Sequence, residues 1–181
     1  MKELNVVIVK PSKYEPSDYV QRFRWGFLPN ATGNYIKSMT PKVVDGCKVN
    51  AEFIDEYVHT DLNYLERLKS SPGAQTLVAL VGVQSHQFQR ALDLAAFAKE
   101  HGSLAIIGGA HPMTCDTSML QGKGISFALA EAESIWPIIL RDSLYGELQI
   151  VYGPNSAGLK NSKRRCYNHR QSATSNAISS R

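Results

Sequence analysis

A strand–helix–strand pattern between Thr76 and Pro112 constrains the fold more than any other part of this sequence. The segment contains two apolar runs of strand length, TLVALVGV and LAIIGG, both rich in valine, isoleucine and leucine. Between the runs, apolar residues recur at helical spacing from Phe88 to Ala98, and Gly102 follows as a helix-ending glycine. Two parallel strands joined by one helix form a right-handed crossover. The sequence therefore predicts a βαβ unit at the centre of an α/β domain.

Further apolar runs predict more strands of the same sheet, and helices between them. The additional strands are Leu4–Val9, Lys48–Val58 and Ile125–Ala130, with Leu148–Tyr152 as either an edge strand or the exit from the domain. The additional helices are Ala31–Met39, Asp61–Ser70 and Ser134–Leu144. This alternation predicts an open, doubly wound parallel sheet of five strands, flavodoxin-like or Rossmann-like, in the order 2-1-3-4-5.

The chain divides into a domain and a basic tail. We expect residues 1–153 to form the α/β domain, which is long enough to bury a core. Residues 154–181 carry six basic residues and no acidic ones, with too few large aliphatic side chains to offset the entropy cost of ordering. We therefore expect a disordered tail. A truncated or frame-shifted linker would explain its composition, and a basic arm for RNA or an anionic surface is the alternative.

The composition of the domain argues against several functional classes. Without the tail, 14 basic residues stand against 16 acidic ones, a net charge of −2 that is not typical of a nucleic-acid-binding surface. No apolar run approaches the about 18 residues of a membrane helix, and the first run is too short for a secretory signal. Cys47, Cys115 and Cys166 match no metal or disulfide spacing. We therefore expect a cytoplasmic protein without a metal site.

The predicted strand order places a ligand crevice at the carboxyl ends of strands 1 and 3, with strand 4 alongside. Three loops flank this crevice: the loop from Pro11 onward, Gly82–Gln87 and Gly108–Pro112. The pair Gly108-Gly109 either exposes bare backbone to a flat ligand or forms a plain turn. Ser85 either caps the following helix or donates a hydrogen bond to a ligand nitrogen.

The loop from Lys13 to Asn30 is long and aromatic, and includes Trp25 and Phe27. Its aromatic side chains either form a lid over the crevice or pack the loop down. The sequence has no glycine-rich phosphate loop, no nucleophile elbow and no zinc-protease motif. It also shows no spacing of ionisable residues that indicates acid–base catalysis. We therefore predict no catalytic residue in this chain.

Two runs, LVALVGVQSHQFQRALDLAAFAKEHGSLAIIGGAHPM and ISFALAEAESIWPIILRD, resemble the cobalamin-binding domain at the front of many radical SAM enzymes. Such domains typically show a strand ending in Val-Gly, a polar Ser/Thr turn, a helix and then Ile-Gly-Gly-x-His-Pro. The resemblance extends over Leu4–Tyr152, and its specific part covers Leu77–Asp142. A Gly-Glu-x-Glu-like turn follows in the family, and here Ala130 replaces its glycine.

The resemblance implies that the nucleotide tail of cobalamin enters the crevice between strands 1 and 3. In this arrangement a serine contacts the nucleotide tail, and a glycine pair lets the tail lie against the backbone. The three residues that follow the glycine pair form the rim of the crevice, and two glutamates lie in the last loop beside the cofactor. The cofactor-binding residues that this predicts, together with their neighbours, are Gly82, Val83, Gln84, Ser85, Gly108, Gly109, Ala110, His111, Pro112, Glu131 and Glu133.

Two departures from the family limit what the resemblance implies. The first loop, KPSKYEP, lacks the Asp-x-His-x-x-Gly motif that supplies a histidine to cobalt in many cobalamin domains, so we predict no metal-ligating residue. The chain also lacks Cys-x-x-x-Cys-x-x-Cys, so neither an iron–sulfur cluster nor a SAM site is expected in it. A separate or missing radical SAM catalytic domain is then the expected partner, besides cobalamin.

Three functions follow for comparison. The first is a cobalamin-binding module of a radical SAM enzyme, of the methyltransferase type, that performs no catalysis of its own. The second is a structural or protein-interaction domain of the same fold without a cofactor. The third is a small nucleotide-dependent enzyme of flavodoxin-like fold, against which the missing phosphate-binding motif argues.

Overall fold

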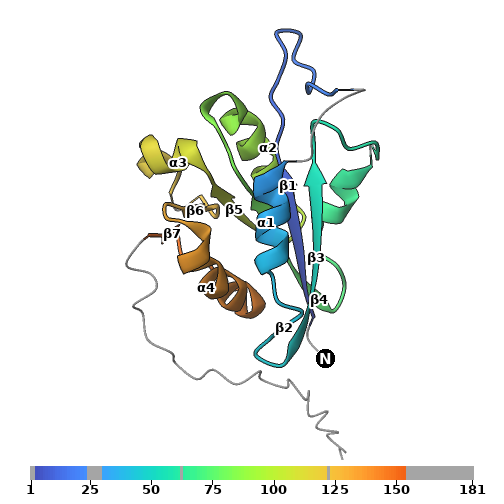
Figure 1. Cartoon of the computed structure of the whole chain (residues 1–181), viewed down its shortest axis with the longest axis vertical. Helices are drawn as coiled ribbons and strands as arrows, with labels where there is room; N and C mark the ends of the chain where they lie inside the picture. The colour runs from blue at the N-terminus through green and yellow to red at the C-terminus, as the bar shows by residue number, and fades with distance from the viewer. Residues whose placement is uncertain (1–2, 24–29, 62, 122, 154–181) are drawn as a thin grey trace, which may run out of the picture.

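One mixed sheet of seven strands runs through the molecule (Figure 1). The computed structural model describes residues 3–23, 30–61, 63–121 and 123–153. The predictions for the tail 154–181, for Cys166 and for Trp25 and Phe27 lie outside the described residues. The strand order is β2-β3-β1-β4-β5-β6-β7, and every neighbouring pair is parallel except β2–β3. The strands are β1 (Glu3–Lys10), β2 (Val43–Val44), β3 (Cys47–Asp55), β4 (Ala74–Leu80), β5 (Leu104–Gly108), β6 (Ser126–Ala128) and β7 (Val151–Tyr152).

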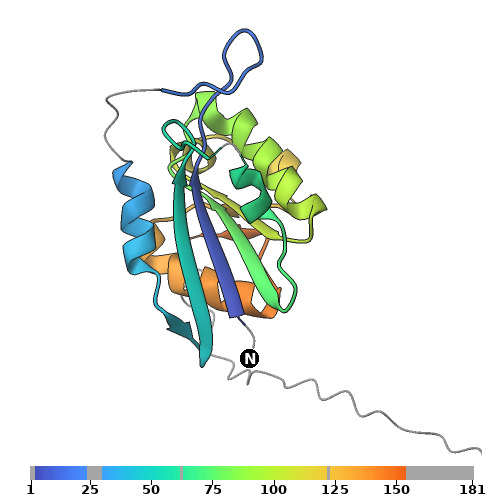
Figure 2. The same cartoon turned by 90° about the vertical axis from the view of Figure 1, so that its right-hand side faces the viewer.

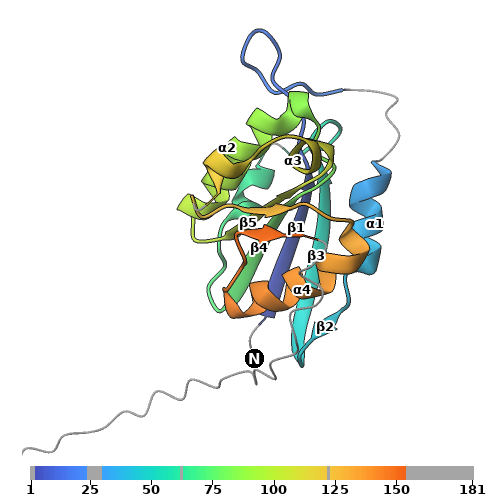
Figure 3. The same cartoon turned by 90° about the vertical axis from the view of Figure 1, so that its left-hand side faces the viewer.

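Helices cover both faces of the sheet (Figures 2 and 3). Helices α1 and α4 pack on one face, and α2 with the 3₁₀ helix η1 packs on the other. A short helix, α3, follows β5 at its carboxyl end. The helices are α1 (Ala31–Met39), η1 (Tyr64–Leu68), η2 (Ser85–Gln87), α2 (Phe88–Glu100), α3 (Ala110–Thr114), η3 (Ser118–Leu120) and α4 (Ala132–Tyr145).

The α/β class is confirmed, but the predicted sheet of five strands is wrong in its strand count. The five predicted strands form the parallel block β3-β1-β4-β5-β6. The strand that the prediction missed, β2, has only two residues and forms a hairpin with β3 through Asp45 and Gly46, which have φ angles of 47° and 77°. The segment left open as an edge strand or an exit forms β7, which pairs with β6. Two residues are too few to show a periodic pattern, which is why β2 left no signal.

Two local predictions are wrong. Only the short η1 forms where a helix was predicted over Asp61–Ser70. Within η1, Tyr64 and Leu68 are the buried residues, and packing of an apolar face is what normally sustains a longer helix. Ser85 is not a helix cap, because the side chains of Gln84 and Gln87 form a reciprocal capping box at the start of η2.

Alternation along β1 decides which of its side chains reach the α1/α4 face. Leu4, Val6 and Ile8 belong to the core beneath α1 and α4. Lys10 lies two residues further along on the same face, at the carboxyl end of the strand. Its register neighbour on the parallel strand β3 is Asp55. The fold therefore brings a buried lysine and a buried aspartate to one edge of the sheet.

Helix α1 lies close to β3 because of a glycine. A methyl group added at Gly33 would lie 2.0 Å from the ring of Phe53, so a larger residue would push the helix away from the sheet. Glycine normally weakens a helix. Here the helix start is held by Asn30, whose Oδ1 accepts a hydrogen bond from the N–H of Gly33 at 3.1 Å. The close packing of α1 matters for function because the helix forms one wall of the cavity described next.

Candidate functional site

Two hollows lie at the carboxyl edge of the sheet, where the central parallel strands end. The first, which we call the apolar cavity, lies between the α1/α4 layer and the ends of β4, β5 and β6. The second, which we call the polar pocket, lies at the ends of β1 and β3 and beside η2. Open α/β sheets bind ligands at this edge. The two hollows are therefore the candidate functional site.

The apolar cavity has a volume of about 140 Å³ and is lined mostly by aliphatic side chains. Ala79, Ile106 and Ala128 line it from the sheet, and Ile135, Trp136 and Ile139 line it from α4. The exposed residues Thr32, Met113 and Glu131 mark the side on which it opens. The indole nitrogen of Trp136 donates a hydrogen bond to Thr40 Oγ1 at 3.0 Å, which fixes the ring as a wall. A hollow of this lining favours a flat apolar group over a charged one.

The cavity lining contains three glycines, and a side chain would meet different surroundings at each of them. A methyl group at Gly108 would lie 3.2 Å from the Cβ of Ala128, so a side chain there would fill the cavity side of β5. Gly109 has a φ of 140°, and a methyl group there would lie 2.1 Å from the backbone nitrogen of Val83. A methyl group at Gly82 would meet no backbone and would lie 3.5 Å from Lys10 Nζ. Close packing on the Val83 backbone therefore requires glycine at position 109, the φ of 60° favours glycine at position 82, and at position 108 the Ala128 methyl group leaves little room for a side chain.

The loops after β4 and β5 are tied together by backbone hydrogen bonds. The N–H of Val83 donates to the carbonyl of Gly108 at 3.0 Å, and the N–H of His111 donates to the carbonyl of Val83 at 2.9 Å. Ser85 Oγ and His111 Nδ1 lie 3.1 Å apart, and the His111 ring lies on Phe88 with a centroid distance of 4.0 Å. The two loops thus form one rigid rim beside the cavity.

The predicted site residues fall into three groups in space. Those that line the apolar cavity are Gly82, Gly108, Gly109 and Glu131. Those that form the rim or are buried behind it are Val83, Ser85, Ala110, His111 and Pro112. The remaining two lie apart from these groups: Gln84 lines the polar pocket, and Glu133 accepts a hydrogen bond from Tyr35.

Glu133 links α4 to α1 on the outer side of the cavity. Its Oε1 accepts a hydrogen bond from the Tyr35 hydroxyl at 2.9 Å. Its own backbone N–H at the start of α4, and then the Tyr35 hydroxyl, lower the pKa of the Glu133 carboxyl. Both side chains are exposed. The contact therefore bridges the two helices without closing the cavity.

The polar pocket has a volume of about 340 Å³ and centres on a buried lysine. Lys10 is only 6% exposed, and its Nζ donates hydrogen bonds to the carbonyl of Gly82 and, at 2.7 Å, to Gln87 Oε1. Gln87 is held in turn by the N–H of Gln84 and by the Tyr57 hydroxyl. The ammonium group is therefore fixed in place by groups that carry no charge.

Burial lowers the pKa of the Lys10 ammonium to about 8, and the nearby carboxylate of Asp55 partly opposes this shift. Among the described residues, no carboxylate oxygen lies within 4.0 Å of Lys10 Nζ. Asp55 instead accepts hydrogen bonds from the N–H groups of Asn30 and Tyr57, at 3.3 and 3.1 Å. Lys10 is thus a buried cation without a close counter-charge.

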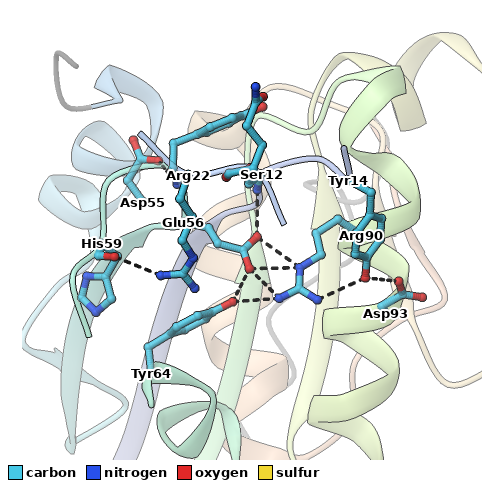
Figure 4. Close-up of polar contacts among 11 residues, drawn as sticks. Ser12, Tyr14, Arg22, Asp55, Glu56, His59, Tyr64, Arg90 and Asp93 are labelled. Atoms are coloured by element: carbon cyan, nitrogen blue, oxygen red, sulfur yellow. Dashed lines mark hydrogen bonds and ion pairs between the residues drawn. The ribbon is translucent and has the colours of Figure 1, made fainter. Parts of the chain in front are cut away.

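A second cation, Arg90 of α2, is partly buried on the α2 face of the sheet, opposite Lys10, and Figure 4 shows its polar contacts. Arg90 of α2 holds the fully buried carboxylate of Glu56, with Nη2 2.6 Å from Oε1 and Nε 3.3 Å from Oε2. The carboxylate also accepts hydrogen bonds from the Tyr64 hydroxyl and, at 2.9 Å, from the N–H of Ser12. Arg90 further donates to the Tyr14 hydroxyl at 3.2 Å. This network joins the first loop, β3 and α2, and every charge in it is paired.

Neither Lys10 nor the Arg90–Glu56 pair was predicted from the sequence. Lys10 directly follows the apolar run of β1, and a charged residue at the carboxyl end of a buried strand is a weak signal for this edge. The pairing of Glu56 with Arg90 spans 34 residues and leaves no local pattern. The structure places His86 in the polar pocket and His111 against Ser85.

The described part of the chain holds no group of three or more histidine, cysteine, aspartate or glutamate side chains that could bind a metal ion. It also holds no helix that is both long and apolar enough to span a bilayer. Comparisons with protein-family models, with curated proteins and with solved structures each gave no match. The two hollows are therefore the features of the molecule from which a function can be inferred.

Proposed function

We propose that this chain is a cobalamin-binding module that resembles the N-terminal domain of a cytoplasmic radical SAM enzyme of the methyltransferase type. In this proposal the parallel block β3-β1-β4-β5-β6 is a flavodoxin-like core, and a separate radical SAM domain is the catalytic partner. The observation that carries the proposal is the apolar cavity, whose lining includes Gly82, Gly108 and Glu131 at the positions to which the family resemblance points.

The size and lining of the cavity support a flat aromatic ring as its occupant. Its volume of about 140 Å³ is close to that of an engineered apolar cavity of about 150 Å³ that holds benzene. Aliphatic side chains of α4 face aliphatic side chains of β4, β5 and β6 across it. The benzimidazole ring of the cobalamin tail is a flat apolar group of suitable shape. Burying it would be favourable by roughly 25 cal/mol for each Å² of apolar surface.

The rim offers polar groups for the part of the ligand outside the cavity. Ser85 carries a hydroxyl and His111 an imidazole beside the cavity. Such groups donate to and accept from amide substituents like those around the corrin ring. When bound, cobalamin would supply a cobalt ion that carries a methyl group between SAM and substrate. The residues of this chain would only bind and orient it.

We predict that no histidine of this chain binds cobalt. His111 Nδ1 already faces Ser85 Oγ at 3.1 Å and its ring lies on Phe88. His86 lines the polar pocket beside Lys10 and Lys13. Bound hydroxocobalamin should therefore show the visible spectrum of a cobalamin in which neither a protein histidine nor the cofactor's own benzimidazole binds cobalt. The spectrum of a histidine-bound form would contradict this prediction.

One observation favours the cofactor-free alternative. Gly109 approaches the Val83 backbone so closely that close packing within the chain explains this glycine without any ligand. A domain that uses its Gly-Gly turn only for folding would keep the same backbone hydrogen bonds. Replacing Gly109 would then test folding rather than binding. The decisive variants must lie elsewhere in the cavity lining.

Mixing the purified chain with hydroxocobalamin, desalting it and recording the visible spectrum tests the proposal. We expect stoichiometric corrinoid absorbance in the protein fraction. Ala130→Leu places a larger side chain in the cavity lining and should reduce retention at least tenfold. Ala31→Leu makes the same change at an exposed position outside both hollows and should leave retention unchanged. Colourless wild-type protein at high micromolar cofactor would support the cofactor-free domain instead.

A further inference from the structure

Gly82 lines the apolar cavity, and its carbonyl accepts a hydrogen bond from Lys10 of the polar pocket. The methyl position at Gly82 lies 3.5 Å from Lys10 Nζ and 3.6 Å from the methyl group of Thr32. Thr32 lines the apolar cavity and Lys10 lines the polar pocket. A side chain at Gly82 would occupy the space between them. The lining of the apolar cavity and Lys10 of the polar pocket are therefore neighbours at Gly82.

The polar pocket is suited to an anion. Lys10 and Lys13 contribute two cationic side chains, His86 contributes an imidazole, and Asp55 is the acidic side chain in the lining. Asp55 is already engaged by two backbone N–H groups. An ammonium group has three N–H donors, and two of those on Lys10 have described partners, Gly82 and Gln87. The third donor is available to a ligand.

We propose that Lys10 binds the phosphodiester of a ligand whose aromatic ring fills the apolar cavity. The inference rests on the proposed function, because the benzimidazole of cobalamin is joined through a ribose to a phosphodiester. A buried cation that is hydrogen-bonded only to neutral groups lacks the partner that normally offsets its loss of hydration. A phosphate oxygen supplies that partner through a charge-assisted hydrogen bond.

This role explains why the lysine is kept buried at a strand end. Burial lowers the pKa of Lys10, because the charged amine loses hydration at this position. An anion beside the amine would favour the charged form, so binding and protonation of Lys10 support each other. Lys10 would then distinguish ligands that carry the phosphate from ligands that carry only the ring.

Four ligands test the assignment: hydroxocobalamin, cobinamide (which lacks the nucleotide tail), the free benzimidazole riboside and its 3′-phosphate. Trp136 in the cavity wall provides a fluorescence signal for the tail fragments. At pH 7 we expect the wild-type chain to bind the riboside 3′-phosphate at least tenfold more tightly than the riboside. In Lys10→Met this ratio should fall to about one, with the affinity for the uncharged riboside unchanged.

Two further variants make the result specific to the charge of Lys10. Lys10→Gln keeps a hydrogen-bond donor without the charge, and should lose the same preference if Lys10→Met folds poorly by circular dichroism. Lys37→Met removes an exposed lysine of α1 that lines neither hollow and should keep the tenfold preference. Equal affinities of wild type and both Lys10 variants for the phosphate form would overturn the role of Lys10.

The same experiment separates this inference from the proposed function. Wild-type chain that binds hydroxocobalamin, with both Lys10 variants binding it equally well, supports the module and overturns the role of Lys10. Wild-type chain that binds the riboside 3′-phosphate through Lys10 but retains no corrinoid supports the phosphate site and overturns the cobalamin module. Binding of none of the four ligands overturns both.

Discussion

A buried cation, Lys10, and a partly buried one, Arg90, lie at the same edge of the sheet but on opposite faces, and they differ in how their charge is satisfied. Arg90, on the α2 face, is held by the fully buried carboxylate of Glu56. Lys10, on the α1/α4 face, donates to the Gly82 carbonyl and the Gln87 amide. This difference indicates that the two cations have different roles. The paired cation fixes the loops, whereas the cation without a close counter-charge is available to a ligand.

The largest expected effect is on the paired side. Arg90→Met leaves the carboxylate of Glu56 buried without its counter-charge, so we expect the free energy of unfolding to fall by about 3 kcal/mol or more. Chemical denaturation at pH 7 measures this. The double variant Arg90→Met with Glu56→Gln should recover a large part of the loss, because no buried charge remains. A loss below about 1 kcal/mol in the single variant would show that the network is not a structural anchor.

A smaller effect is expected from Lys10, and it depends on pH. Burial lowers the pKa of Lys10 in the folded chain from its ordinary value of 10.5 to about 8. Between these two values the unfolded state binds more protons, so the Lys10 contribution to stability rises with pH and is complete above 10.5. The unfolding free energy of wild type minus that of Lys10→Met should therefore increase by up to about 3 kcal/mol from pH 7.5 to pH 10.5.

Subtracting the variant removes the contributions of the other lysines and tyrosines that titrate in this range. Lys37→Met serves as the control, since an exposed lysine should give a difference that is flat with pH. A flat difference for Lys10→Met as well would mean that the Lys10 ammonium is as well hydrated as a surface one. In that case the missing carboxylate partner would not distinguish Lys10 from Arg90 energetically.

The smallest effect is expected at Asp55, whose carboxylate is the one that opposes the lowering of the Lys10 pKa. Asp55→Asn removes this charge and keeps one acceptor, the amide oxygen, for one of the two backbone N–H groups of Asn30 and Tyr57, which donate to different carboxylate oxygens in the wild type. The pKa of Lys10 should then fall further, by about one pH unit or less. Comparing Asp55→Asn with the Asp55→Asn/Lys10→Met double variant over the same pH range measures the shift. An upward shift would contradict the assignment of Asp55 as the nearby charge.

Much of the fold could be predicted because the apolar runs are long and uninterrupted. The five strands of the parallel block and helices α1, α2 and α4 all follow from local periodicity. The same reasoning failed for β2, which has two residues, and for the helix predicted over Asp61–Ser70, where only η1 forms. Short elements are determined by their neighbours in space, and a local pattern carries little information about them.

The candidate site was predicted only in part. The loops that contain Gly82, Gly108 and Glu131 do meet at one cavity. The glycine pair, however, divides in role, because Gly109 packs on the Val83 backbone while Gly108 faces the cavity. Ser85 proved to be a partner of His111 rather than a helix cap. Spacing places residues at a strand end, but it does not tell which face or neighbour each one meets.

By itself the sequence determined that parallel strands alternate with helices and that small and polar residues gather at their carboxyl ends. The tertiary structure alone decided that Lys10 and Arg90 face opposite layers, that of these two only Arg90 has a carboxylate partner, and that Lys10 lies beside Gly82 of the apolar cavity. The reason is physical. Periodicity is a local property of the chain, whereas burial of a charge and the approach of another charge depend on residues far away in the sequence.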